Sequence, residues 1–199
     1  MPNIINDFKD ILKNYTVKDN QVILEDEEII SKIETEYQDN FNEFIKELTG
    51  SDDYIVSFEA SKNGTPHRVP FVTFFNKNFS DSYKEGLFLG FSFYTDKGLV
   101  YLKLDQGISS INGDFNMFFV RGEKLRQDYI TDIPSEFDFD QTKCAAGNIL
   151  GKNYTFDDLT IELITEDLKY LLDVYESIIP DYEEIKKQSF NEIVETLNI

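Results

Sequence analysis

The sequence is poor in the residues from which metal and redox sites are most often built. Its 199 residues include one cysteine, one histidine and no tryptophan. A single cysteine, Cys144, cannot form a disulfide within the chain, and a single histidine, His67, cannot supply a histidine-rich metal site. We therefore expect no cofactor and no catalytic centre of these kinds.

Long apolar runs are also missing. None approaches the ~20 residues that a membrane span needs. Residues 1–15 carry Asp and Lys among their apolar residues, which is unlike the apolar region of a secretory signal. These two absences predict a cytoplasmic protein that does not enter a membrane.

Basic residues are scarce and unevenly placed. The chain has 19 Lys and Arg against 38 Asp and Glu, a formal net charge of −19. Nonspecific nucleic-acid binders need a basic footprint, so the whole-chain charge argues against that class. Residues 60–126, however, hold nine basic and six acidic residues, and the other residues hold 10 basic and 32 acidic ones. The acidic flanks are then solvated helix faces or, alternatively, the surface of an acidic protein-interaction module that mimics DNA.

Apolar residues at helical spacing predict helices at both ends of the chain. The first helix covers residues 4–12, and the second covers residues 26–48 and stops at Gly50. A third is expected to begin at Thr165, a good N-cap, and to break at Pro180, before a last helix over residues 185–197.

The middle of the chain changes to an alternating, aromatic pattern that is typical of strands. Five strands are expected, at Tyr54–Ala60, Val69–Phe75, Leu87–Tyr94, Leu99–Leu104 and Phe115–Val120. Residues 127–154 are irregular and are expected to form a long loop. The order of elements predicts an α+β fold. Its mainly antiparallel sheet of about five strands, open or curled towards a barrel, is flanked by N- and C-terminal helices. We expect a helical segment, residues 1–50, and a second part, residues 51–199, in one compact unit.

The long loop carries the acidic residues Asp132, Glu136, Asp138 and Asp140. They lack the spacing of a calcium loop. Metal-dependent hydrolysis by these carboxylates is kept as a third hypothesis, weaker than binding.

The hairpin formed by residues 87–104 presents two unlike faces, because side chains alternate along a strand. One face of its first strand is apolar and is expected in the core: Leu87, Leu89, Phe91 and Phe93. The other face is mixed: Phe88, Gly90, Ser92 and Tyr94. Tyr101 and Lys103 join this mixed face if the hairpin loop has two or four residues. Such a face either packs under a helix or forms a shallow cup for a planar ligand, with Lys103 near a phosphate.

Two runs in this region resemble the N-terminal specificity domain of McrB-type, modification-dependent restriction systems. The first is an Arg-x-Pro-aromatic element, Arg68-Val69-Pro70-Phe71. The second is a Gly- and Tyr-rich strand that ends in Tyr-Leu-x-Leu-x-Gln-Gly, here residues 101–107. The resemblance extends over residues 54–179, and the N-terminal helices are less recognisable.

The resemblance implies a domain that reads DNA and does not cut it. Its members bind double-stranded DNA that carries a modified base, such as 5-methylcytosine, and flip this base into a pocket. In the full systems a separate AAA+ GTPase module and a nuclease subunit carry out translocation and cleavage. This chain is then an excised domain, a stand-alone relative or one part of a split system.

The candidate residues follow from the resemblance and from the hairpin. The base pocket is expected to comprise Phe71, Phe88, Ser92, Tyr94 and Tyr101. Contacts to the DNA backbone are expected from Lys62, Arg68, Lys77, Lys84 and Lys103.

Overall fold

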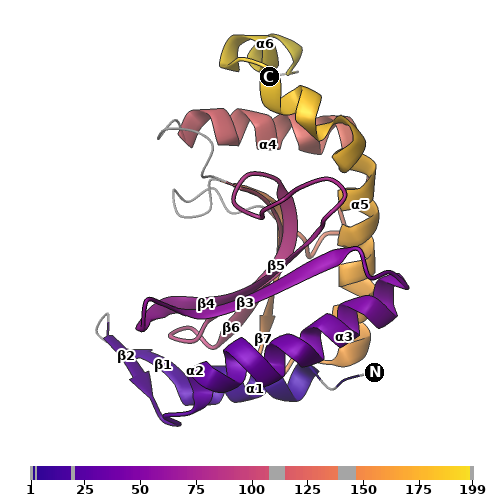
Figure 1. Cartoon of the computed structure of the whole chain (residues 1–199). Coiled ribbons are helices and arrows are strands. Elements are labelled where there is room, and N and C mark those ends of the chain that lie inside the picture. Colours follow the sequence, from indigo (N-terminus) through magenta and orange to yellow (C-terminus); the bar gives the residue numbers. More distant parts are fainter. Residues whose placement is uncertain (1, 3, 19–20, 108–114, 139–146, 198–199) are drawn as a thin grey trace.

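The computed structural model describes residues 2, 4–18, 21–107, 115–138 and 147–197. A sheet lies at the centre of the molecule, with the N-terminal helices and α5 packed on one of its faces (Figure 1). The elements follow in this order: α1 (Ile4–Asn14), β1 (Tyr15–Lys18), β2 (Gln21–Leu24), α2 (Ile29–Lys32), η1 (Ile33–Tyr37), α3 (Gln38–Thr49), β3 (Tyr54–Lys62), β4 (Thr65–Asn76), β5 (Leu87–Tyr94), β6 (Leu99–Gln106), α4 (Phe115–Tyr129), β7 (Asn148–Thr155), α5 (Ile161–Lys187) and α6 (Phe190–Thr196).

The central sheet has five antiparallel strands in the order β3-β4-β5-β6-β7, so each strand pairs with its neighbour in sequence. The sheet is open, with β3 and β7 at its edges. Tyr94 pairs with Leu99, which leaves a four-residue loop between β5 and β6. With this loop length Ser92 pairs with Tyr101 and Gly90 with Lys103. The predicted α+β class and the shared mixed face of the hairpin are therefore confirmed.

The N-terminal helices form where helical spacing predicted them. In α1 the residues Ile4, Ile5, Phe8 and Ile11 are buried. The second helical stretch runs through α2, a π-helical turn and α3, and ends at Gly50 in the left-handed conformation. The small hairpin β1–β2 between the two stretches was not predicted, and it contacts β4 through β2.

The predicted strand at residues 115–120 is wrong, because these residues begin helix α4. A short apolar run is compatible with both the two-residue period of a strand and the 3.6-residue period of a helix. The buried residues of this segment follow the helical period. Met117, Phe118, Arg121 and Leu125 are all buried, at spacings of one, three and four residues.

The fifth strand is instead β7, inside the segment that was expected to be a loop. Its sequence, NILGKNYT, includes Gly, Asn and Lys, which are depleted in strands, and a single β-branched apolar residue. Pairing with β6 and burial of Ile149, Leu150 and Tyr154 outweigh this weak local preference. Strand β7 is thus specified by tertiary contacts.

Helix α5 begins earlier and ends later than predicted. Its N-cap is Thr160, whose side chain accepts a hydrogen bond from the backbone N–H of Leu163, and Thr165 lies inside the helix. The helix also continues past Pro180. Proline removes one backbone hydrogen bond, but residues on both sides, such as Ile178 and Tyr182, are buried and hold the two halves in place. Figure 1 shows α5 reaching from the N-terminal helices to α4 and α6.

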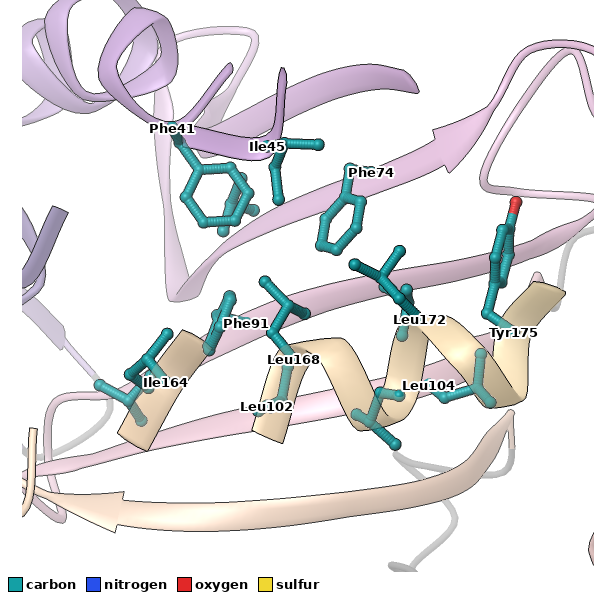
Figure 2. Packing of buried hydrophobic residues seen from close by; sticks show 14 of the residues in the cluster. Phe41, Ile45, Phe74, Phe91, Leu102, Leu104, Ile164, Leu168, Leu172 and Tyr175 are labelled. Carbon is teal, nitrogen blue, oxygen red and sulfur yellow. The ribbon is translucent and has the colours of Figure 1, made fainter. Parts of the chain in front are cut away.

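The main core lies between this sheet face and the helices. Figure 2 shows Phe41 and Ile45 of α3 above Phe74 and Phe91 of the sheet, with Ile164, Leu168, Leu172 and Tyr175 of α5 beside Leu102 and Leu104. Phe91 contacts the rings of Phe8 and Phe41 at centroid distances of 5.0 and 5.8 Å. The N-terminal helices therefore share one core with the sheet.

Candidate functional site

The opposite face of the same sheet carries a cavity of about 670 Å³. It is lined by β4, β5 and β6, by the loop of residues 77–86, and by Val17 of β1. Phe88, Ser92 and Tyr94 of β5 line it, whereas the intervening Leu89, Phe91 and Phe93 belong to the core. The alternation of one strand thus separates a sealed core from an accessible cavity.

One wall of the cavity is a row of aromatic rings. The Tyr83 ring lies 6.2 Å from that of Phe71 and 5.7 Å from that of Phe88, in both cases edge to face. Outside the lining, the His67 ring lies 5.7 Å from that of Phe71. Such a row offers both ring faces and ring edges to a planar ligand.

Tyr83 is held in this wall by a hydrogen bond. Its hydroxyl donates to Glu59 Oε1 at 2.7 Å. Burial, and then this hydrogen bond to a carboxylate, raise the pKa of Tyr83 well above its ordinary value. The hydroxyl stays protonated, so the ring is a neutral stacking surface at physiological pH.

The loop that carries Tyr83 is fixed against the end of β6. The backbone N–H of Gly107 donates to the carbonyl oxygen of Gly86 at 2.7 Å. A Cβ atom at Gly107 would lie 2.2 Å from the carbonyl carbon of Lys84, so only glycine allows this close approach. Gly107, directly after β6, therefore helps to set the position of the aromatic wall.

Four basic side chains line the cavity: Arg68, Lys84, Lys97 and Lys103. Three of their ammonium groups lie near cavity aromatics: Lys84 at 5.6 Å from the Tyr83 ring, Lys97 at 5.3 Å from Tyr94 and Lys103 at 5.4 Å from Phe88. Arg68, Lys84 and Lys97 are exposed, and Lys103 is half-buried. Asp96 and Asp105 are the acidic residues that line the same cavity. The described lining is therefore locally cationic in a chain whose net charge is −19.

A connected set of polar groups lies at the β6–β7 side of the cavity. The Tyr101 hydroxyl donates to Asn148 Oδ1 at 3.0 Å, and Asn148 Nδ2 donates to Asp105 Oδ1 at 2.9 Å. The other oxygen of Asp105 pairs with Lys103 Nζ at 2.6 Å. Asp105 is only 7% exposed. This set holds one carboxylate and one ammonium group in fixed positions at the cavity.

The N-terminal hairpin is anchored beside the cavity through Tyr15. Its single hydroxyl proton is shared between the carbonyl oxygens of Ala60, at 3.0 Å, and His67. Burial raises the pKa of Tyr15 well above its usual value, so the hydroxyl remains a donor. This anchor explains how Val17, far away in sequence, reaches the cavity lining.

The structure brings most of the predicted pocket residues together. Phe71, Phe88, Ser92 and Tyr94 line the cavity, and Tyr101 does not. Tyr101 lies on the same sheet face, but its side chain leans over β7. A Cβ atom at Gly151 would be 2.3 Å from the Tyr101 hydroxyl oxygen, so glycine makes room for this ring.

The predicted backbone contacts divide in a similar way. Arg68, Lys84 and Lys103 line the cavity. Lys62 is exposed next to the turn between β3 and β4, outside the lining. Lys77 pairs with Asp53 at 3.2 Å, also away from the cavity. The excess of basic residues in the segment 60–126 therefore pointed to the region of the cavity. It did not show that Lys62 and Lys77 lie outside the cavity lining.

Sequence reasoning missed further lining residues. These are Val17, Val69, Thr73, Tyr83, Asp96, Lys97, Asp105, Gln106, Gly107 and Gly147. Tyr83 and Lys97 lie in turns, where the alternation of side chains along a strand cannot predict which face of the sheet they join. A signal for Asp105 was available, since it shares the alternation of Tyr101 and Lys103. The irregular register of β6 and β7 after Leu104 was not visible in the sequence.

The acidic segment forms no metal site in the part of the chain that the structure describes. No group of three or more His, Cys, Asp or Glu residues is gathered there. Glu136 lies 3.7 Å from Lys152, and the backbone of Asp138 pairs with Gly151 of β7. Asp140 and Cys144 lie outside the described residues. The segment from 136 to 138 thus packs along β7.

Comparison with protein families identifies the family of the chain. The family described as MrcB-like, N-terminal domain matches residues 10–180. The chain belongs to this family. The comparison with curated proteins found no match.

Membership makes the chain an McrB-type restriction-system domain. The MrcB-like match begins at residue 10, so it includes most of the segment 1–50 as well as the sheet and α5. None of the helices in the described ranges combines the length and apolar composition needed to cross a membrane.

Proposed function

We propose that this MrcB-like domain binds double-stranded DNA that carries a modified base and receives that base, flipped out of the duplex, in the cavity. 5-Methylcytosine is the first candidate. The observation that carries the proposal is the combination in one cavity of an aromatic wall and four cationic side chains. A flipped base needs a stacking surface, and its phosphates need positive charge.

The size of the cavity agrees with this role. Its volume of about 670 Å³ lies within the usual range of small-molecule sites, roughly 300–1,000 Å³. A nucleobase with its sugar is at the small end of such ligands. The cavity therefore has room for the base, the sugar and a substituent on the base.

The lining residues divide into two roles. Phe71, Tyr83 and Phe88 provide the stacking surface, which returns part of the free energy spent on unstacking the base. Arg68, Lys84 and Lys97 are exposed and are placed to contact phosphates on either side of the flipped nucleotide. Lys103 is already paired with Asp105, so it is assigned to the cavity interior.

The charge of the whole chain limits how this binding operates. With a net charge of −19, most of the surface repels DNA, and the cavity side offers a cationic approach. We therefore propose that binding by this domain alone is weak and falls steeply with salt. The proposal needs no cofactor. An AAA+ GTPase module and a nuclease subunit are the proposed partners that would turn recognition into cleavage.

The test is a binding titration at low salt with matched duplexes. Fluorescence anisotropy would compare one sequence with cytosine, 5-methylcytosine or 5-hydroxymethylcytosine at the same position, in several flanking contexts, and with N6-methyladenine. We expect at least one modified duplex to bind more tightly than its unmodified twin. A fluorescent base analogue opposite the modified position should brighten on binding, because flipping unstacks its partner. Equal affinity for every twin would reject the proposal.

A further inference from the structure

The cavity contains hydrogen-bond acceptors whose capacity is not filled. Asp105 accepts from Asn148 through one oxygen and pairs with Lys103 through the other. Each carboxylate oxygen has two lone pairs, so each can accept one more donor. Asn148 and Lys103 also fix the orientation of the carboxylate, which leaves it as a preset acceptor.

Gln106 supplies a second acceptor. It lines the cavity and is 1% exposed. Its Nε2 donates to the carbonyl oxygen of Phe118 at 3.2 Å, which fixes which end of the amide is oxygen. Its Oε1 has no hydrogen-bond partner among the described residues. Unsatisfied buried polar atoms are rare in native proteins, and one at a cavity points to a ligand donor.

Acceptors at such a site distinguish bases by one substituent. Cytosine and adenine carry an exocyclic amino group, which donates, whereas thymine carries a carbonyl oxygen at the equivalent position. A carbonyl oxygen placed against the carboxylate of Asp105 would lose its hydrogen bond to water and gain none from that carboxylate. Sites built around a hydrogen-bonding group reject analogues that lack it far more strongly than they reject differences in size.

We infer that the cavity selects flipped bases that carry an exocyclic amino group, and that Asp105, with Gln106, is the specificity-determining acceptor. This inference rests on the proposed function and adds the base class and the residues that read it. Thr73 lines the same cavity, and its hydroxyl also has no partner among the described residues. It is therefore available as a donor to a ring nitrogen or carbonyl of the same base.

The first test uses the unaltered protein and base pairs that differ only at the amino position. Anisotropy would compare 5-methylcytosine opposite guanine with thymine opposite guanine, and 5-hydroxymethylcytosine with 5-hydroxymethyluracil. Mismatched thymine is easier to extrude, so flipping cost alone favours the thymine duplex. We expect the amino base to bind at least about fivefold more tightly, as good base-edge contacts allow.

The outcomes separate the two proposals. Equal or tighter binding of the oxo bases, together with a preference for modified over unmodified DNA, would overturn this inference and leave the proposed function standing. Loss of any preference for modified DNA would overturn both.

A pair of variants then tests the residue. Asp105→Asn and Asp173→Asn each remove one negative charge, the first from the cavity and the second from the exposed surface of α5, outside the cavity lining. We expect the ratio of affinities for amino over oxo bases to fall towards one in Asp105→Asn and to stay unchanged in Asp173→Asn. Equal ratios in both variants would remove Asp105 from this role. If thermal melting shows that Asp105→Asn does not fold, Gln106→Leu and the comparison with the unaltered protein still decide the inference.

Discussion

The two faces of the central sheet are built from the same strands and do different things. On the helix-covered face, β5 presents Leu87, Leu89, Phe91 and Phe93, all of which are buried in the core cluster. On the other face it presents Phe88, Ser92 and Tyr94 to the cavity. Both faces are rich in aromatic rings, so aromatic content does not separate a core from a binding surface. The faces differ in what covers these rings: helices pack on one face, whereas the other lines a cavity that also contains exposed basic side chains.

The faces also differ in how they treat charge. On the covered side Lys152 pairs with Asp167 of α5 at 2.8 Å, and Tyr154 donates to the same carboxylate at 2.7 Å. These charged groups are buried and satisfied within the protein. On the cavity side Arg68, Lys84 and Lys97 remain exposed. The first arrangement contributes to stability, and the second is available to a partner.

The largest expected effect separates the two faces by stability. Phe91→Ala should lower the free energy of unfolding by about 3–5 kcal/mol, because it leaves a void among fully buried rings. Phe71→Ala, on the half-buried cavity wall, should cost only about 1 kcal/mol. Urea unfolding followed by circular dichroism measures both. Equal losses would show that the cavity wall is part of the core.

The buried ion pair gives the next effect. Asp167→Asn removes the buried carboxylate that pairs with Lys152, which keeps the more exposed Glu136 at 3.7 Å. It should destabilise the fold by about 1.5–3 kcal/mol. The control is Glu184→Gln, which breaks the exposed pair with Lys187 at 2.7 Å. Exposed pairs contribute little, so this control should unfold at the same urea concentration as the unaltered protein. A similar shift in both variants would contradict the contrast between the faces.

The cavity wall should matter for binding more than for folding. On the proposed function, Phe71→Ala should weaken binding of modified DNA by about 1–3 kcal/mol, or roughly 5- to 150-fold. Phe156→Ala removes an exposed ring outside the cavity lining and is the matched control. Anisotropy at constant salt checks both variants. An unchanged affinity for Phe71→Ala would exclude this ring as a stacking partner.

The smallest expected effect is electrostatic. Lys84→Ala should reduce the slope of log affinity against log salt by about 0.9, the value for one phosphate contact. It should weaken modified and unmodified duplexes to the same degree, because phosphate contacts carry no base information. Lys187→Ala, in the exposed pair on α5, should leave the slope unchanged. A slope that is the same in both variants would remove Lys84 from the DNA interface.

Much of the fold was predictable because local signals and tertiary packing agree. The apolar stripes of α1 and α3 match their burial, and alternate residues of β5 divide between the core cluster and the cavity lining. The errors fall where the two disagree. The segment 115–120 is aromatic like a strand but begins a helix in which Met117, Phe118 and Arg121 are buried, and β7 has few strand-forming residues but completes the sheet. Neither could be resolved without knowing what each segment packs against.

The site was predictable to the extent that it lies on regular strands. Alternation along β5 is sufficient to place Phe88, Ser92 and Tyr94 on one face. Tyr83 and Val17 come from a loop and a distant hairpin, which reach the cavity through Gly107 and Tyr15. Tyr101 lies beside the cavity and outside its lining, because it leans towards Gly151 of β7, a strand that was not predicted.

The junction of Gly86 and Gly107 has a mechanical consequence. The backbone of the loop is hydrogen-bonded to the sheet there, so Tyr83 is held in place. On the proposed function, this side chain therefore has little freedom to close over a bound nucleotide. On the proposed function, the deformation needed for a base to enter the cavity then falls on the double helix, whose readiness to kink varies with its base steps. Neighbouring sequence would in that way influence recognition even where no side chain touches it.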